Sequence, residues 1–448
     1  MAGRKEMDLT TGRPFGSLLR FAVPVILGNL FQLFYTLADS VIVGKTLGAD
    51  SLAAVGSTSI IIYFVLCFIN GFTGGFGICL GQRCGARDER GMRKSIAVST
   101  ILSVAFAVVL TVLCCVLSHQ IIRWMKIPAD IAVEAYAYMF VVLLGTGATV
   151  FYNMISNILR ALGDSKTPLY FLVFSSVLNI FLDILFILPL GMGVAGAASA
   201  TILSQFLSAV LSLMVGMRRF AVLHLRKADF ANLGNAMVVH LKTGFPMGFQ
   251  MSVMCIGQLA MQMVVNSLGT AAVAGYTAAS KADQLSVLVN NAMMTAISNY
   301  VAQNFGAGKR ERICQGVRAS LIQTETFNVL MCAGIILLRH PIVELFMSNP
   351  TKEIYHYSDA YLTIVAPFYV ILGLLAVYRT TIQSMQNGWA PFAACMIELV
   401  MRISATVGLV GMLGYTSVCI ASPMAWFGAC ALLIPCYYRM MKAWKKDK

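Results

Sequence analysis

Charged residues are scarce in this chain, and the shortage excludes an ordinary soluble protein. Of the 448 residues only 12% are charged and 58% are apolar, whereas about a quarter are charged in a typical soluble domain. One water-soluble core cannot hide this apolar excess, but a chain dissolved in lipid can carry it. Because each crossing of a bilayer takes roughly 20 apolar residues, the length allows about a dozen crossings and no large soluble domain.

Histidine and closely paired cysteine are also in short supply, which disfavours a metal centre and a disulfide framework. The 5 histidines lie at or beyond the ends of the apolar runs, and the 12 cysteines lie mostly inside those runs without a C-x-x-C pair. The sequence has no phosphate-binding glycine loop and no convincing nucleophile with its base. We therefore expect neither an enzyme nor a protein with a bound cofactor.

Apolar runs bounded by charged or Gly/Pro clusters predict about twelve membrane-spanning helices. The runs do not alternate over about ten residues, as the strands of a membrane barrel would. The predicted fold class is therefore an all-α polytopic membrane protein. The expected spans are 18–44, 52–81, 94–118, 131–159, 168–190, 193–217, 242–266, 270–302, 312–338, 354–385, 391–413 and 416–440.

Positive charge dominates the connections between these spans. The net charge is +14, which in a soluble protein would raise nucleic acid as a partner. When both termini are placed in the cytoplasm, most of the Lys and Arg residues fall on the cytoplasmic side, as in membrane proteins generally. The sequence thus predicts a multi-pass protein of the cell membrane with both termini cytoplasmic and no nucleic-acid partner. Its basic surface would meet lipid head groups.

The second half of the chain repeats the first. Pro24 recurs as Pro246, and the Q-x-x-G-A turn that begins at Gln82 recurs at Gln303. Six spans separate the copies, so both have the same orientation in the membrane, as in parallel-repeat transporters. We expect a six-helix lobe over residues 1–217, a cytoplasmic linker over 218–241 and a second six-helix lobe over 242–448.

Four segments make the chain resemble the multidrug and toxic compound extrusion (MATE) family. They are F-Q-L-F-Y-T-L-A-D-S-V-I-V-G at 31–44, the two Q-x-x-G-A turns, L-G-D-S-K-T-P at 162–168, and the pair Asn179 and Asp183. The resemblance covers essentially the whole chain. It implies two six-helix lobes forming a V, and export of organic cations and other amphipathic drugs in exchange for Na⁺ or H⁺.

Polar side chains form a stripe on the first span and another on the fifth. Residues three or four apart share one face of a helix, so each stripe must face protein or water. Ionisable groups inside a bilayer are costly, which makes the carboxylates of these stripes functional candidates. The stripes consist of Asn29, Gln32, Thr36 and Asp39 on the first span, and Ser175, Asn179 and Asp183 on the fifth.

Three of the polar groups in this half are expected at one depth in the membrane. The rise per residue of a helix places Asp39, Asp183 and Thr201 roughly 8 to 12 Å below the outer ends of their spans. Carboxylates, an amide and a hydroxyl together suit Na⁺, or a proton on one carboxylate. The resemblance implies the coupling site on Asp39, Asn179, Asp183 and Thr201, with Gln32, Tyr35 and Asn153 in the same cavity.

The second half lacks an equivalent of Asp39 and carries other charged residues instead. Glu398 and Arg402 lie four residues apart, so they are expected either to neutralise each other within one helix or to serve separately. The alternative is that Glu398 or Asp283 attracts a cationic substrate, and both are candidates for the substrate cavity. Two further charged residues inside the expected spans of this half are Lys281 and Arg379.

Two functions remain open from the sequence. The favoured one is a secondary active antiporter that exports amphipathic, cationic organic compounds in exchange for Na⁺ or H⁺, for which a monomer suffices. The alternative is a flippase for lipid-linked oligosaccharide or lipid, in the same superfamily, which would need a positively lined cavity. Acidic Asp39 and Asp183 favour the first, and cavity-facing Lys281, Arg379 and Arg402 would favour the second.

Overall fold

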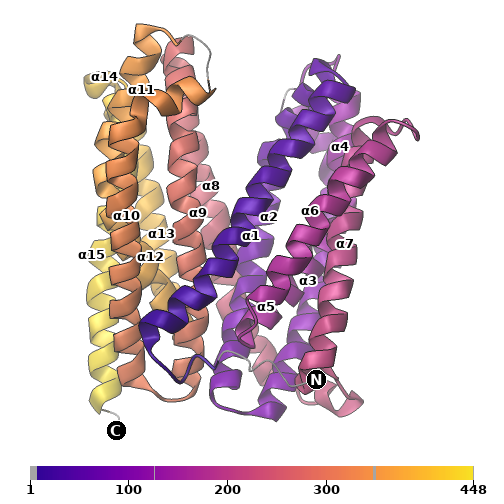
Figure 1. The fold of residues 1–448 in the computed structure, drawn as a ribbon, viewed down its shortest axis with the longest axis vertical. Helices are drawn as coiled ribbons and strands as arrows, with labels where there is room; N and C mark the ends of the chain where they lie inside the picture. The colour runs from indigo at the N-terminus through magenta and orange to yellow at the C-terminus, as the bar shows by residue number, and fades with distance from the viewer. Residues whose placement is uncertain (1–7, 126, 347–349, 447–448) are drawn as a thin grey trace. The chain divides into compact units, whose positions relative to one another are not determined.

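The computed structural model describes residues 8–125, 127–346 and 350–446. Within these ranges the chain is almost entirely helical and contains no strand, which confirms the predicted fold class (Figure 1). Ten helices are long and apolar enough to cross a membrane, and an eleventh span is a bent pair. Large apolar side chains point outward along them: Val116, for instance, is 74% exposed. Such a surface is stable only against lipid.

The chain divides into two compact units. The first contains Asp8 and Val23–Gly248, and the second contains Leu9–Ala22 and residues 249–446. Helix α1 (Pro14–Thr46) therefore starts in the second unit and continues in the first, and helix α8 (Gly234–Ser267) does the reverse. Pro24 and Pro246 lie close to these two boundaries. A proline removes one backbone hydrogen bond from a helix, so a bend costs less at these places.

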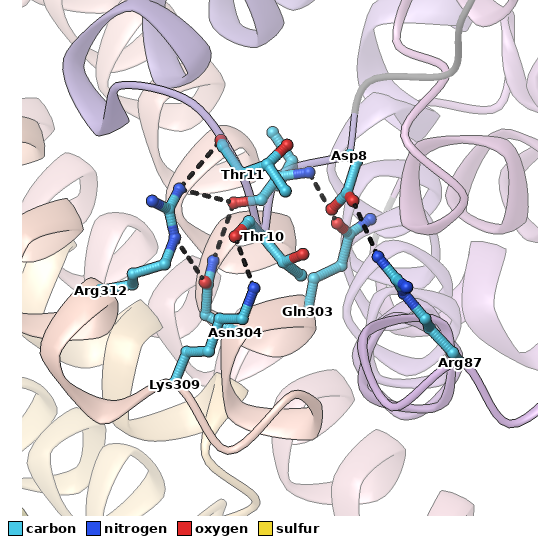
Figure 2. Close-up of polar contacts among 9 residues, drawn as sticks. Asp8, Thr10, Thr11, Arg87, Gln303, Asn304, Lys309 and Arg312 are labelled. Carbon is cyan, nitrogen blue, oxygen red and sulfur yellow. Dashed lines mark hydrogen bonds and ion pairs between the residues drawn. The ribbon is translucent and has the colours of Figure 1, made fainter.

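The segment that precedes α1 is fastened to the second unit through its backbone (Figure 2). Six hydrogen bonds of 2.9 to 3.3 Å hold it, all of them from or to side chains around the turn between α9 (Thr270–Gly306) and α10 (Arg310–Phe346). They join Gln303, Asn304, Lys309 and Arg312 to the backbone of Leu9, Thr10, Thr11 and Gly12. This anchoring explains why the start of α1 belongs to the second unit.

The first unit continues with α2 (Ala49–Gly85), α3 (Glu89–Trp124), α4 (Ala132–Leu144), α5 (Thr146–Ala161), α6 (Lys166–Ile187) and α7 (Gly193–Arg219). Helices α4 and α5 together occupy the predicted span 131–159, but they meet at a bend of 44°. Gly145 lies at that bend, in close contact with the side chain of Ile202. A larger residue would not fit there.

The start of α8 lies against α2 in the same unit at very short range. A Cβ added to Gly75 would be 2.6 Å from the Cα of Gly244, and one added to Gly71 would be still closer to the carbonyl oxygen of Met247. Small residues allow two helix backbones to approach in this way in a membrane.

Helical structure extends into both ends of the expected linker 218–241. Helix α7 extends to Arg219 and α8 already begins at Gly234. The residues between them contain two 3₁₀ turns, Ala221–Leu223 and Lys227–Phe230. Phe220 and Leu223 are buried against the core of the first unit, so this connection is packed rather than free.

The second unit contains α9, α10, α11 (Lys352–Val365), α12 (Tyr369–Ser384), α13 (Trp389–Ile403), α14 (Val410–Leu413) and α15 (Thr416–Lys446). A 3₁₀ turn at Ala366–Phe368 with Pro367 joins α11 to α12, and a π-helical turn at Ser404–Gly408 joins α13 to α14. These helices correspond to the six spans expected in the second half. Helix α9 is not among those that pass as membrane spans by length and composition.

Candidate functional site

Two carboxyl groups meet in the interior of the first unit. Asp39 comes from α1 and Asp183 from α6, and the two carboxyl groups are close enough for a proton held by one to be donated to the other. Asp183 is 0% exposed. Carboxylates carry no donor when ionised, so two of them form a hydrogen bond only when one holds a proton. The pair is therefore built to share a proton or to hold a small cation between them.

Asn179 and Thr201 lie beside this pair. Asn179 is one helical turn from Asp183 on α6, and its Nδ2 donates to the Oγ1 of Thr201 on α7 at 3.3 Å. The tight packing of α6 on α7 is supported by Ser208, whose hydroxyl donates to the carbonyl of Phe171 at 2.7 Å. The four residues that the resemblance assigns to the coupling site thus lie within one unit, as the neighbouring pairs Asp39 with Asp183 and Asn179 with Thr201.

The pair and its neighbours contain more acceptors than donors. In the described part of the chain no donor reaches Oδ1 of Asp39, Oδ1 of Asn179 or either carboxylate oxygen of Asp183, and all four atoms are buried. Buried acceptors without partners cost free energy. A bound Na⁺ or a proton relieves this cost, because it supplies the missing positive charge.

The residues expected in the surrounding cavity differ in how closely they approach the site. Tyr35 lies near Asp39 and hydrogen-bonds to Gln205. Gln205 in turn accepts from the hydroxyl of Thr149 at 2.9 Å. Asn153 donates to the carbonyl of Thr149 at 2.9 Å and so lies one turn away on α5. Gln32 is exposed, and the structure gives its side chain no contact with the two carboxyl groups.

Two residues near the site have no place among the sequence-based candidates. Tyr138 on α4 lies within electrostatic reach of both Asp39 and Asp183. Gln205 lies four residues after Thr201 on α7, so helical spacing could have found it. Tyr138 gives no such signal, because an aromatic residue in an apolar run looks like packing.

The charged residues of the second unit are paired differently from the prediction. Glu398 on α13 forms an ion pair with Arg379 of α12, and each side chain is only 4% exposed. Of the two alternatives left open for Glu398, the intrahelical pair with Arg402 is not seen among the described residues, where Glu398 pairs with the neighbouring helix instead. Asp283 on α9 lies beside Tyr361 and Tyr369, within electrostatic reach of Arg402. Each of these two acids, which the sequence proposed for the substrate cavity, has a basic neighbour inside its own unit.

These features define a class of protein. The chain is a polytopic helical membrane protein of two units, with ten or eleven spans in its described part and a carboxyl pair inside one unit. That is the construction of a secondary transporter with a parallel repeat.

The family follows from comparison with known proteins. The model of the MatE family matches residues 24–185 and again residues 246–407, so the chain belongs to the MatE family. The two matches coincide with the internal repeat. Members of this family are transporters, and the chain is a multi-pass membrane protein.

Individual relatives agree with this assignment. The chain is similar to "Probable multidrug resistance protein YpnP" of Bacillus subtilis, with 31% identity over 99% of both chains. A solved multidrug resistance MATE family transporter of the MOP superfamily, in an outward-facing conformation, has a TM-score of 0.90 and 25% identity, with 100% of both chains covered. A "FAD transporter" of Shewanella oneidensis is 21% identical over 87% of each chain.

Proposed function

We propose that this protein is a secondary active antiporter of the cell membrane that exports amphipathic, cationic organic compounds in exchange for Na⁺ or H⁺. The observation that carries the proposal is the pair Asp39 and Asp183, which lie together inside the first unit with three buried carboxylate oxygens that no described donor reaches. Both termini lie in the cytoplasm, as the distribution of Lys and Arg indicates. The names of relatives such as the Bacillus protein support drug export.

Competition for the carboxyl pair couples the two transported species in this proposal. An ion shifts a conformational equilibrium only through its different affinity for the two states. An entering ion neutralises Asp39 and Asp183, removes the acceptors that attract a cationic cargo and so favours its release. Because Asp39 lies on α1, which also carries Pro24, ion binding acts on a helix that is able to bend.

Export of a cation fits the buried charges better than transport of an anion. The relative named as a FAD transporter and the flippase alternative would both favour a cavity lined by positive charge. In the second unit, however, Arg379 is neutralised by Glu398, and Arg402 lies within reach of Asp283. Arg379 and Arg402 therefore leave no clear surplus of positive charge there, whereas the first unit holds two acids in contact.

Proteoliposomes test the proposal and identify the ion. The purified chain is reconstituted, and export of ethidium is measured under a sodium gradient alone and under a pH gradient alone. We expect one gradient to drive accumulation against the ethidium gradient, and the same gradient to fail once Asp39 is replaced by asparagine. Accumulation that neither gradient drives would contradict antiport.

A further inference from the structure

Glu325 is a further acid of the second unit, and neither the sequence analysis nor the proposed mechanism uses it. It lies near the middle of α10, one of the helices long and apolar enough to cross a membrane. The residue is partly buried, but both of its carboxylate oxygens are buried. An ionised carboxylate in this position, far from both membrane surfaces, is costly.

The residues around the Glu325 carboxylate leave space for it, but they do not neutralise its charge. A Cβ added to Gly373 of α12 would lie 2.5 Å from Oε1 of Glu325 and 2.5 Å from Nδ2 of Asn328, so the absence of a side chain there admits both groups. Nδ2 of Asn328 already donates to the carbonyl of Tyr369 at 2.9 Å and to Oδ1 of Asn290 at 3.5 Å. The same amide also hydrogen-bonds to the carboxyl group of Glu325, but an uncharged donor does not cancel the charge of a carboxylate.

The other buried acids of this unit have cationic neighbours, whereas Glu325 has none that the structure describes. Arg379 is paired with Glu398, and Arg402 is the cation near Asp283. The side chain that interacts most strongly with the carboxyl group of Glu325 is the uncharged amide of Asn328, through a hydrogen bond.

No ionisable group of a neighbouring helix is seen to neutralise Glu325 in the described part of the chain. Cys430 on α15 interacts electrostatically with Glu325, and it lies near Arg379 as well. The helices packed against α10 also carry other ionisable groups: Lys281 and Asp283 on α9, and Lys352, His356 and Asp359 on α11. None of these acts on the Glu325 carboxyl group, and Arg379 of α12 is paired with Glu398.

The polar residues Asn290, Glu325 and Asn328 can be compared with the residues at the equivalent positions of the first half of the repeat. Helices α2 and α9 each have 37 residues, and α3 and α10 follow them after turns of the same length. The two helix pairs therefore align without a gap. In this alignment the first unit has Ile69, Val104 and Ala107 where the second has Asn290, Glu325 and Asn328. Because apolar residues fill the same places in the first unit, packing alone does not explain the polar ones.

We propose that Glu325 is a proton-binding group of the second unit, in addition to the ion site at Asp39 and Asp183 in the first unit. This proposal rests on the antiport function above. A proton from the outer aqueous side forms an O–H bond on one oxygen of Glu325 and neutralises it. When the unit changes state, that O–H bond breaks and the proton passes to water on the cytoplasmic side. Asn290, Asn328 and Gly373 position the carboxyl group.

The test uses the full chain and the neutral isostere Glu325→Gln. Infrared difference spectra between acid and neutral pH record the carbonyl band of a protonated carboxyl group, and a pH-sensitive dye inside proteoliposomes counts the protons exchanged per ethidium molecule. We expect Glu325→Gln to lose one component of the band and one of the protons exchanged. Glu311→Gln, the same change in the exposed first turn of α10, should change neither.

Three outcomes separate this proposal from its alternatives. An unchanged band and proton count in folded Glu325→Gln would overturn it. If that variant does not fold, Gly373→Ala replaces it in the test. The added methyl group would press on Oε1 of Glu325 and should shift the carbonyl band of its protonated carboxyl group. An unshifted band would overturn the proposal. Failure of antiport itself would abolish ion-driven export in the unmodified chain, while the infrared band of Glu325 would remain measurable.

Discussion

Replacing Asp183 by asparagine is expected to reduce ion-driven export of ethidium by a factor of ten or more while leaving the chain folded. Asparagine has nearly the same shape, but it cannot ionise or bind a proton. Coupling between two ligands is worth about 1 to 3 kcal/mol, or roughly 5- to 150-fold in affinity, and loss of the carboxylate removes it. Efflux from cells and from everted vesicles measures the effect.

Asp39→Asn should have a similar effect, because the two acids act as a pair. The double variant should then be little worse than either single one, since residues in one network are not additive. Asp50→Asn is the matched control: it makes the same change in the exposed first turn of α2 and should leave efflux intact. Normal ion-driven efflux by both single variants would show that the pair does not couple transport.

Breaking the ion pair of the second unit is expected to give the largest loss of stability. Glu398→Leu leaves Arg379 charged and buried, with its side chain 4% exposed. Removing one partner of a buried pair typically costs about 3 to 5 kcal/mol. The temperature of unfolding in detergent, followed by fluorescence of a buried-thiol dye, should fall by several degrees.

The double variant Arg379→Met with Glu398→Leu provides the control. Replacing both partners by apolar residues is often neutral or stabilising, so the double variant should regain most of the lost stability. If the single variant unfolds at the temperature of the unmodified chain, the two groups are not a buried ion pair in the membrane protein.

The spans and the first-unit cluster were predictable because both are periodic. Long apolar runs give helices, and residues three or four apart share a face. The stripe ending at Asp39 and the stripe ending at Asp183 could therefore be expected to point inward. Helix rise then placed the two acids at one depth, and the structure brings them into contact.

Contacts between helices were less accessible from the sequence. Spacing alone favoured Arg402 as the partner of Glu398, but the chain packs Arg379 of a neighbouring helix against it. Glu325 was missed because it is a single acid in an apolar run, and its neighbour Gly373 comes from another helix. The expected span began at residue 242, whereas α8 begins at Gly234, because Gly234 and Asn235 resemble a loop although they lie on the helix.

Release of the bound ion on addition of substrate tests the central claim most directly. Purified protein in lightly buffered detergent solution is mixed with ethidium while released protons are followed with a dye and released Na⁺ with an electrode. The account predicts that ethidium releases one kind of ion from the unmodified chain, and that Asp183→Asn releases less of it. Ethidium that binds to the unmodified chain without releasing either ion would contradict the account.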